Sequence, residues 1–155
     1  MTAACDLLVI GAGIQGAGVA QAAAARGYTV RVLEQTGVAS GTSCRSSKLI
    51  HGGLRYLESG QFDLVRESLR ERDILLRIAP TLVRRVPFHV PVYRGSRRGP
   101  WTLRAGLSLY ALLDGLRAHS GFSSLPRRDW DQLDGLDTRG LRAVFRYEDA
   151  QTDDA

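Results

Sequence analysis

The sequence Asp6-Leu7-Leu8-Val9-Ile10-Gly11-Ala12-Gly13-Ile14-Gln15-Gly16 decides the fold of this chain. Residues 6–10 form a short apolar run that fits a strand buried on both faces. The three glycines follow the spacing Gly-x-Gly-x-x-Gly, and each has a mechanical reason. Gly11 permits a tight turn, Gly13 lets the backbone approach a pyrophosphate, and Gly16 brings a helix close to the strand. This pattern predicts a nucleotide-binding turn between a strand and a helix.

The residues after the glycines complete a β-α-β unit. The alanine-rich segment through Arg26 predicts a helix packed on the sheet, and residues 29–34 alternate like a second, parallel strand. A pyrophosphate is expected beside Ile14 and Gln15, because the N–H groups of a helix amino terminus favour negative charge. Glu34, which ends the second strand, can accept hydrogen bonds from ribose hydroxyls. A dinucleotide site is expected; the alternative is an alanine-rich helix that merely packs closely, and the glycines do not distinguish NAD from FAD.

Composition limits the class of protein. The chain has 155 residues, with 44% hydrophobic and 24% charged residues, which is enough for one soluble domain with a core. Cys5 and Cys44 show no metal-binding spacing, so we expect no metal site and reduced thiols in the cytoplasm. We expect no secretory signal before the first strand, and no apolar run of the sequence approaches the roughly 18 residues of a membrane-spanning helix.

The net charge of +5 is unevenly distributed. No acidic residue lies between Asp73 and Asp114, a segment that contains Arg77, Arg84, Arg85, Arg94, Arg97, Arg98 and Arg104. Such a segment is drawn to phosphate or to an anionic membrane surface, or it is simply a solvated basic surface. No nucleic-acid-binding motif accompanies the charge, so no nucleic-acid partner is expected.

Several elements are expected after the β-α-β unit. Residues 36–53 predict a functional loop with at most a helical turn, and residues 62–79 predict a helix that ends at Pro80. The remaining pattern predicts an edge strand, an amphipathic helix, a weak short helix and a short strand, over residues 86–93, 103–116, 129–136 and 143–147. Because the chain ends soon after a strand that nothing covers, we expect a truncated sequence with an open sheet edge.

The segment Ser46-Ser47-Lys48-Leu49-Ile50-His51-Gly52-Gly53-Leu54-Arg55-Tyr56-Leu57-Glu58 combines residues that packing alone does not require. Its Lys48 is the only lysine among the 21 basic residues. The segment closely resembles the family signature of the FAD-dependent glycerol-3-phosphate dehydrogenases and their relatives, the glycerol-3-phosphate oxidases. The resemblance extends over nearly the whole chain, including Arg26-Gly27, the Thr42-Ser43-x-x-Ser46-Ser47 lead-in and the closing Asp149-Ala150-Gln151-x-Asp153-Asp154-Ala155. Departures from the family pattern are Ala12, Ala22 and Cys44.

The resemblance implies an α/β fold, a Rossmann-like FAD-binding domain of the glutathione-reductase/amino-acid-oxidase type. Residues 1–80 would hold the β-α-β unit, the flavin loop and a helix, and residues 81–155 would begin a substrate domain. The implied activity is oxidation of sn-glycerol 3-phosphate to dihydroxyacetone phosphate, with hydride passing to FAD and electrons to a quinone. The implied location is peripheral, at the cytoplasmic face of the cell membrane, and a homo-oligomer is possible. The alternatives are an oxidase that uses oxygen, and a truncated or degenerate reading frame with at most a nucleotide-binding half-domain.

The resemblance also assigns roles to residues. Arg55 is expected to anchor the substrate phosphate, since its fork of N–H donors matches phosphate. Tyr56 would add a hydrogen bond or only pack, and His51 would handle the proton or serve as a structural hydrogen-bonding residue. Gly52 and Gly53 would allow close approach of the backbone. The expected cofactor-binding residues are Gly11, Gly13, Ile14, Gln15, Gly16, Glu34, Thr42, Ser43, Ser47, Lys48 and Leu49.

Overall fold

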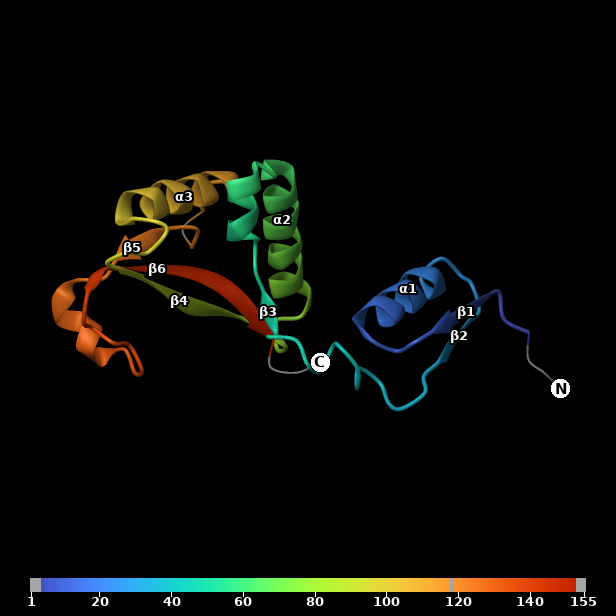
Figure 1. The fold of residues 1–155 in the computed structure, drawn as a ribbon. Helices are drawn as coiled ribbons and strands as arrows, with labels where there is room; N and C mark the ends of the chain where they lie inside the picture. Colours follow the sequence, from blue (N-terminus) through green and yellow to red (C-terminus); the bar gives the residue numbers. More distant parts are fainter. Residues whose placement is uncertain (1–3, 118, 153–155) are drawn as a thin grey trace. The chain divides into compact units, whose positions relative to one another are not determined.

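A computed structural model of the protein describes residues 4–117 and 119–152. The chain divides into two compact units, one that ends at Lys48 and one from Leu49 to Thr152 (Figure 1). The family resemblance implied a boundary between the FAD-binding domain and the substrate domain of the complete protein after residue 80. That boundary stays a prediction. None of the described helices is long and apolar enough to cross a bilayer.

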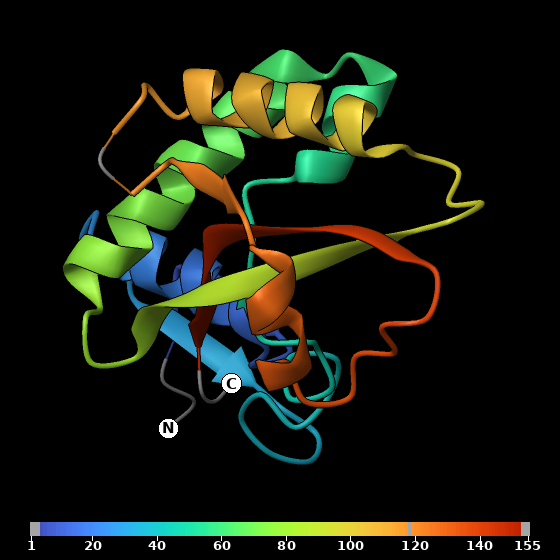
Figure 2. The same ribbon diagram turned by 90° about the vertical axis from the view of Figure 1, so that its left-hand side faces the viewer.

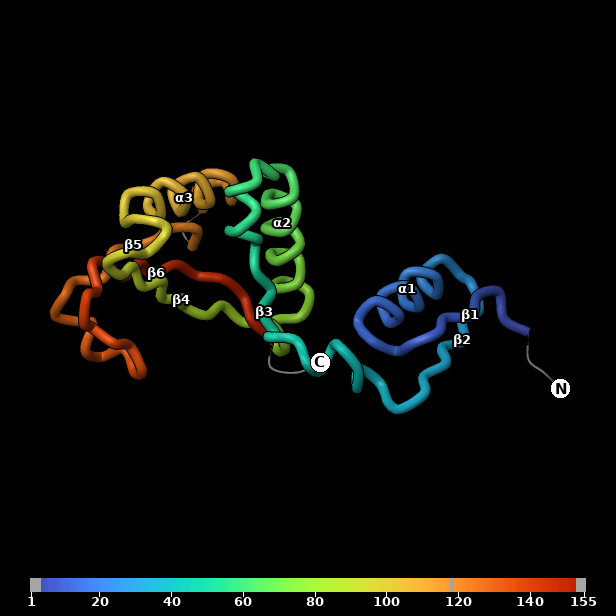
Figure 3. Tube along the Cα trace, in the orientation of Figure 1, coloured from blue at the N-terminus to red at the C-terminus, as the bar shows by residue number. Residues whose placement is uncertain are grey.

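The first unit is the predicted β-α-β unit. Strand β1 (Leu7–Ile10) leads into helix α1 (Ile14–Ala24), and β2 (Val30–Leu33) returns beside β1. The two strands are parallel, in a register that pairs Leu7 with Val30 and Ile10 with Leu33. Beyond β2 the chain runs through a loop of turns as far as Lys48, which the tube in Figure 3 traces. The expected parallel pairing is therefore confirmed.

The burial of β1 differs from the prediction. Val9 is 8% exposed, whereas Leu8 is 50% and Ile10 is 84% exposed, so β1 is not buried on both faces. The reason is that the described part of this unit offers one helix and one partner strand, which cover only one face of a two-stranded sheet. Apolar residues of α1 and β2, such as Val19 and Leu33, are exposed as well. The described first unit therefore presents a large apolar surface.

The second unit is an antiparallel sheet with helices α2 and α3 on one face (Figure 2). Its elements in chain order are β3 (Leu49–Ile50), the 3-10 helix η1 (Leu54–Ser59), α2 (Phe62–Ile78), β4 (Val83–Tyr93), α3 (Pro100–Leu113), β5 (Phe122–Ser124), the 3-10 helix η2 (Arg127–Gln132) and β6 (Leu141–Thr152). The strand order is β3-β6-β4, and β5 also pairs with β6. Side chains of α2 and α3 pack together at Val65, Leu69 and Tyr110, and those of α3 meet the sheet at Leu107, Val92 and Phe145.

Strand β6 is central rather than open. The whole of β4 pairs along one edge, while β5 pairs opposite residues 145–147 and β3 opposite residues 150–151 on the other edge. The predicted open edge is therefore wrong, because two short strands not expected from the sequence pair with residues 145–147 and 150–151 along the second edge of β6. The edge position predicted for the strand with Pro87 and Pro91 is confirmed by β4.

The helix boundaries follow local signals. Helix α2 ends at Ile78, close to the predicted end at residue 79. Helix α3 starts at Pro100, three residues before the predicted start, since proline suits the first position of a helix. It ends at Leu113, because Gly115 and Leu116 adopt positive φ angles of 80° and 52°. The short helix predicted over residues 129–136 is instead the 3-10 helix η2, which contributes Trp130 to a core cluster with Leu141 and Val144.

Candidate functional site

The glycine loop has the close packing that its spacing predicts. Gly11 has a φ of +98°, which only glycine adopts easily. A Cβ on Gly16 would overlap the carbonyl oxygen of Gly11, so α1 begins directly against the turn. A Cβ on Gly13 would lie 3.1 Å from Ser43 Oγ. A side chain therefore has no space at Gly16 and only tight space at Gly13, the position where the glycine pattern lets a pyrophosphate approach the backbone.

The amino terminus of α1 fits an anionic group. Gly13 is the N-cap residue, in extended conformation, and no side chain caps the helix from this position. Ser43 Oγ accepts the N–H of Ile14 at 3.0 Å, which brings the loop after β2 to the helix terminus. Because Ser43 takes the N–H of Ile14, the other N–H groups at the start of the helix are the ones that favour phosphate oxygens. The predicted residues Gly13, Ile14 and Ser43 thus meet at one place, and they fit the pyrophosphate of FAD.

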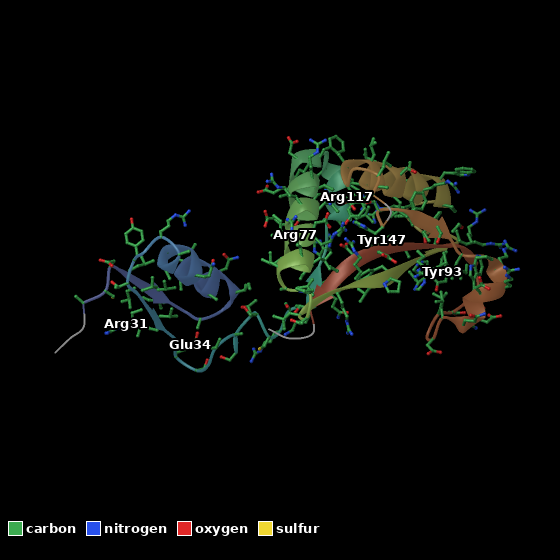
Figure 4. All side chains as sticks on the ribbon, turned by 180° about the vertical axis from the view of Figure 1, so that it is seen from behind. Arg31, Glu34, Arg77, Tyr93, Arg117 and Tyr147 are labelled. Atoms are coloured by element: carbon green, nitrogen blue, oxygen red, sulfur yellow. The ribbon has the colours of Figure 1, made fainter. Side chains whose placement is uncertain are left out.

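Glu34 lies just beyond β2, where it closes the glycine loop (Figure 4). Its Oε2 accepts the N–H of Ala12 at 2.8 Å, and its Oε1 accepts the N–H of Thr36 at 3.0 Å. These two backbone hydrogen bonds, that of Ala12 foremost, lower the pKa of Glu34 to about 2. Oε1 also accepts the hydroxyl of Thr36 at 3.2 Å, whereas Oε2 keeps a lone pair with which Glu34 can accept a ribose hydroxyl. The role predicted for Glu34 is compatible with this geometry.

The segment from Thr42 to Leu49 is only partly organised around the glycine loop. Ser46 Oγ donates to the carbonyl of Ser43 at 3.1 Å and accepts the N–H of Lys48 at 3.2 Å. Lys48 has a φ of 59°, a left-handed conformation that is uncommon for residues other than glycine. The hydrogen bonds described at Ser43 tie it to α1, whereas none places Thr42 or Ser47 at the loop. Leu49 begins the second unit, as the first residue of β3.

Core side chains pack closely against the glycines of the turn His51–Tyr56. Gly52 is buried, and a Cβ there would overlap both Tyr110 Oη and Leu69 Cδ2. Gly53 has a φ of +75°, and its missing Cβ leaves room for the ring of Tyr56. The close approach predicted for both glycines is therefore present, and the groups that approach them are side chains of the second unit itself.

The three residues predicted to react lie on this turn and are exposed. His51 Nδ1 accepts the N–H of Gly53 at 3.1 Å, so the hydrogen of the neutral ring belongs on Nε2. Arg55 and Tyr56 belong to η1, and Tyr56 is 39% exposed. The turn thus brings a hydrogen-bond donor, a guanidinium and a phenol to one exposed stretch of chain.

A buried ionic cluster beneath the turn was not expected from the sequence. Arg72 and Asp149 are each 1% exposed and Asp114 is 6% exposed. Arg72 Nη2 donates to Asp114 Oδ2 at 2.8 Å, and Arg72 Nη1 donates to Asp149 Oδ1 at 3.1 Å. The second oxygen of Asp149 accepts the N–H of Gly52 at 3.3 Å and the hydroxyl of Tyr110 at 3.2 Å. A charged cluster therefore contacts the backbone of the turn directly.

Electrostatics in the cluster follow from burial and pairing. Burial raises the pKa of Asp149, and its ion pair with Arg72 opposes this rise. Burial alone would lower the pKa of Arg72, but Asp114 and Asp149 raise it above its usual value. One signal in the sequence pointed to this cluster: Arg72 continues the helical spacing of Val65 and Leu69, so it falls on the buried face of α2.

Two surface hollows lie in the second unit. One, of about 510 Å³, is lined by predicted residues Leu49 and His51 together with residues of α2. The other, of about 480 Å³, is basic and is lined by Arg70, Asp73, Ile74, Arg77, Arg85, Arg117 and His119; Figure 4 labels Arg77 and Arg117 of this group. The Nε2 atom of His119 in this hollow is buried without a hydrogen-bond partner among the described residues.

Comparisons with known proteins agree with these features. Residues 6–155 match the model of the family described as FAD dependent oxidoreductase. A glycerol-3-phosphate dehydrogenase of Synechocystis sp. is 44% identical over 97% of this chain and 27% of its own length. A D-erythritol 1-phosphate dehydrogenase of Brucella abortus is 47% identical over 97% of this chain and 30% of its own length. The chain thus spans less than a third of these relatives.

A solved structure resembles the fold. Dithionite-reduced L-alpha-glycerophosphate oxidase of Mycoplasma pneumoniae, with FAD bound, superposes with a TM-score of 0.66 at 14% identity. The match covers 96% of this chain and 38% of the oxidase chain. The predicted α/β fold is therefore confirmed, and FAD rather than NAD is confirmed as the cofactor of the family that the chain matches.

Proposed function

The chain belongs to the FAD dependent oxidoreductase family, and on this premise we propose that the protein containing it oxidises glycerol 3-phosphate to dihydroxyacetone phosphate. The observation that carries the proposal is the high identity, over nearly all of this chain, to relatives named as dehydrogenases of phosphorylated polyols. The exposed Arg55 on a firmly held turn supports it, since a guanidinium matches a phosphate monoester.

FAD supplies the acceptor for the hydride that leaves the substrate carbon. In the first unit, the N–H groups at the start of α1 would hold its pyrophosphate, and Glu34 would accept a ribose hydroxyl. Gly13 would admit the pyrophosphate because it has no side chain, and Gly16 lets α1 start directly against Gly11. Ser47, Lys48 and Leu49 remain proposed contacts of the flavin end.

The residues of the turn would have different roles in binding the substrate. Arg55 would bind the phosphate through two parallel N–H groups, and Tyr56 would add its hydroxyl. His51 has its Nδ1 occupied by the N–H of Gly53, so it presents Nε2–H outward as a donor. This supports a hydrogen-bonding role for His51 in place of proton abstraction. The base that takes the hydroxyl proton would then be another residue.

A second substrate is favoured by one comparison. The relative named for D-erythritol 1-phosphate is at least as similar as the relative named for glycerol 3-phosphate. Both compounds carry a phosphate monoester on a polyol, which Arg55 would bind in the same way. Measurement of kcat/KM for the two compounds would therefore show which of them is the preferred substrate.

The electron acceptor and the location are further parts of the proposal. A quinone would reoxidise the flavin at the inner face of the cell membrane, with molecular oxygen as the alternative acceptor. Arg97 in the acid-free segment is exposed, whereas Arg98 pairs with Glu58 and Arg85 with Asp73. Sedimentation with anionic vesicles at low and high salt tests the membrane contact, since screening weakens it. Vesicle binding unchanged by salt and by Arg97→Glu would point to apolar insertion instead.

The test of the activity uses the complete reading frame. The DNA beyond codon 155 is read first, because a stop there would favour the truncated-frame alternative. The complete protein is then purified, and glycerol 3-phosphate is added without oxygen. Bleaching of the flavin absorbance by glycerol 3-phosphate or D-erythritol 1-phosphate, with glycerol inactive, is the expected result. A colourless protein that reduces NAD would contradict the proposal.

A further inference from the structure

The buried cluster under the turn His51–Tyr56 is chemically unlike the rest of the core. Arg72 carries a full charge at 1% exposure, and two acids, Asp114 and Asp149, face its two terminal nitrogens. A third acid, Asp73, lies 3.4 Å from Nη2. The surrounding side chains Val65, Leu69 and Tyr110 are those of a packed core. Burying these charges costs desolvation that their pairing offsets only in part.

Stability alone does not account for the cluster. A buried ion pair is often no better for stability than apolar residues of similar volume. Arg72 Nε is buried and has no hydrogen-bond partner among the described residues, so the pairing is not even complete. An arrangement selected only for stability would more simply continue the apolar face of α2. The cluster is better explained by what it touches.

What the cluster touches is the backbone of the proposed substrate turn. One oxygen of Asp149 faces Arg72, and the other accepts the N–H of Gly52 and the hydroxyl of Tyr110. Asp114, by contrast, bonds to Arg72 and to Ser120 Oγ, with no described hydrogen bond to the turn. Asp149 is thus the member of the cluster that joins its charge to Gly52.

We propose that Asp149 and Arg72 are positioning residues for the turn His51–Tyr56. Arg72 fixes the carboxylate of Asp149, which fixes the amide of Gly52 and so the place from which Arg55 and Tyr56 project. The role rests on the proposed function of Arg55 as the phosphate anchor. Because bidentate binding tolerates little displacement, a small shift of the turn weakens substrate binding strongly.

The chain offers a matched pair of variants. Asp149→Asn and Asp114→Asn each remove one buried negative charge that faces Arg72, and each keeps the size of the side chain. Only Asp149→Asn also disturbs the acceptor of the Gly52 N–H. If the cluster has only a structural role, the two variants should change KM and hydrogen exchange of the turn similarly. If Asp149 positions the turn, only Asp149→Asn should change them strongly.

The experiment uses the complete flavin-containing protein and two measurements. In Asp149→Asn, KM for glycerol 3-phosphate should rise about tenfold or more, as expected for disturbing hydrogen bonds to a charged group, while hydrogen exchange of the amides in residues 49–57 accelerates. In Asp114→Asn, both quantities should stay near the wild-type values even where thermal stability falls. Equal changes in the two variants, or an unchanged Asp149→Asn, would overturn the proposal.

Two further results keep the test decisive. If Asp149→Asn does not fold, Tyr110→Phe removes only the hydroxyl that donates to Asp149, and it should produce a smaller change in the same direction. Wild-type KM and exchange in Tyr110→Phe would then count against positioning. If the wild-type protein does not oxidise glycerol 3-phosphate, the proposed function fails, while the exchange of residues 49–57 still decides whether Asp149 holds the turn.

Discussion

The carboxylate of Glu34 accepts the N–H of Ala12 at 2.8 Å, and this contact ties the end of β2 to the glycine loop. Folding lowers the pKa of Glu34 from 4.5 to about 2. A carboxylate with a lowered pKa stabilises the folded state above its unfolded pKa, and this stabilisation is lost as the pH falls through the folded value. The contribution of this contact to the stability of the folded state should therefore be complete at pH 5 and above, and should be lost between about pH 4.5 and 2.

NMR titration of the Glu34 carboxyl carbon tests this acid range, with Glu34→Gln to assign the signal. A midpoint at 4.5 would show that the hydrogen bonds do not persist in solution. In the complete protein, Glu34→Gln should also weaken retention of FAD at neutral pH, because a neutral amide is a poorer acceptor for both the loop N–H and the ribose hydroxyl.

Two glycines of α1 should respond in opposite ways to alanine. Gly16→Ala forces a Cβ into the carbonyl oxygen of Gly11 and should disrupt the loop and abolish retention of FAD. Gly18→Ala meets no atom within 4 Å and should stabilise the protein by roughly 0.5–1 kcal/mol through helix propensity. Flavin absorbance after gel filtration and thermal melting measure both effects. Gly13→Val should resemble Gly16→Ala, and normal flavin content in either would contradict the proposed pyrophosphate contact.

Arg55→Ala should raise KM for glycerol 3-phosphate by about 10- to 150-fold, the range expected for losing hydrogen bonds to a charged group. Flavin absorbance should be unchanged, since the proposed contact is with the substrate. Arg66→Ala is the control, because Arg66 is an exposed arginine of α2 whose described ion pair is with Asp63. Similar kinetics for the two variants would reduce Arg55 to an ordinary surface charge.

Gly52→Ala should destabilise the protein by about 1–3 kcal/mol, the usual cost of overpacking. The added Cβ would meet Tyr110 and Leu69, which are buried residues of one core cluster. Gly121→Ala, where nothing lies within 4 Å, should change the free energy of unfolding little. Urea unfolding of both variants measures the difference, and equal stabilities would show that the turn is not packed as described.

The 155-residue chain by itself should be poorly soluble and should not oxidise glycerol 3-phosphate. In the described first unit Ile10, Ile14 and Val38 are 84%, 74% and 81% exposed, which favours association. Expression, a flavin spectrum and turnover of the isolated chain are the measurements. A soluble, yellow and active product would contradict this expectation.

The sequence predicted the β-α-β unit well because its signals are local. A strand, three spaced glycines and an alternating second strand lie within one short stretch of sequence. The spacing of the glycines by itself predicts where the backbone must turn or pack closely. The same holds for α2, whose apolar spacing and Pro80 mark its extent. The residues of the turn were predicted from a family resemblance, and the structure adds how Gly52 and Gly53 are packed.

Long-range pairing was not predictable in the same way. Strands β3 and β5 are very short, so they carry no periodicity, and only their pairing with β6 defines them. The cluster of Arg72, Asp114 and Asp149 unites residues distant in the sequence. Arg72 places a charge at the helical spacing of the buried apolar residues Val65 and Leu69, a signal that becomes informative only once a buried partner is known.

The contact between Gly52 and Asp149 also has a consequence for the order of folding during synthesis. The acceptor of the Gly52 N–H, Asp149, lies 97 residues later in the chain. The turn that carries Arg55 therefore lacks this hydrogen bond when it leaves the ribosome. Helix α2 forms from local contacts, but its Arg72 stays without Asp149 until β6 has been made. Slow translation between α2 and β6 would therefore prolong the time during which Arg72 pairs only with Asp73 and Asp114 and the turn has no acceptor for the N–H of Gly52.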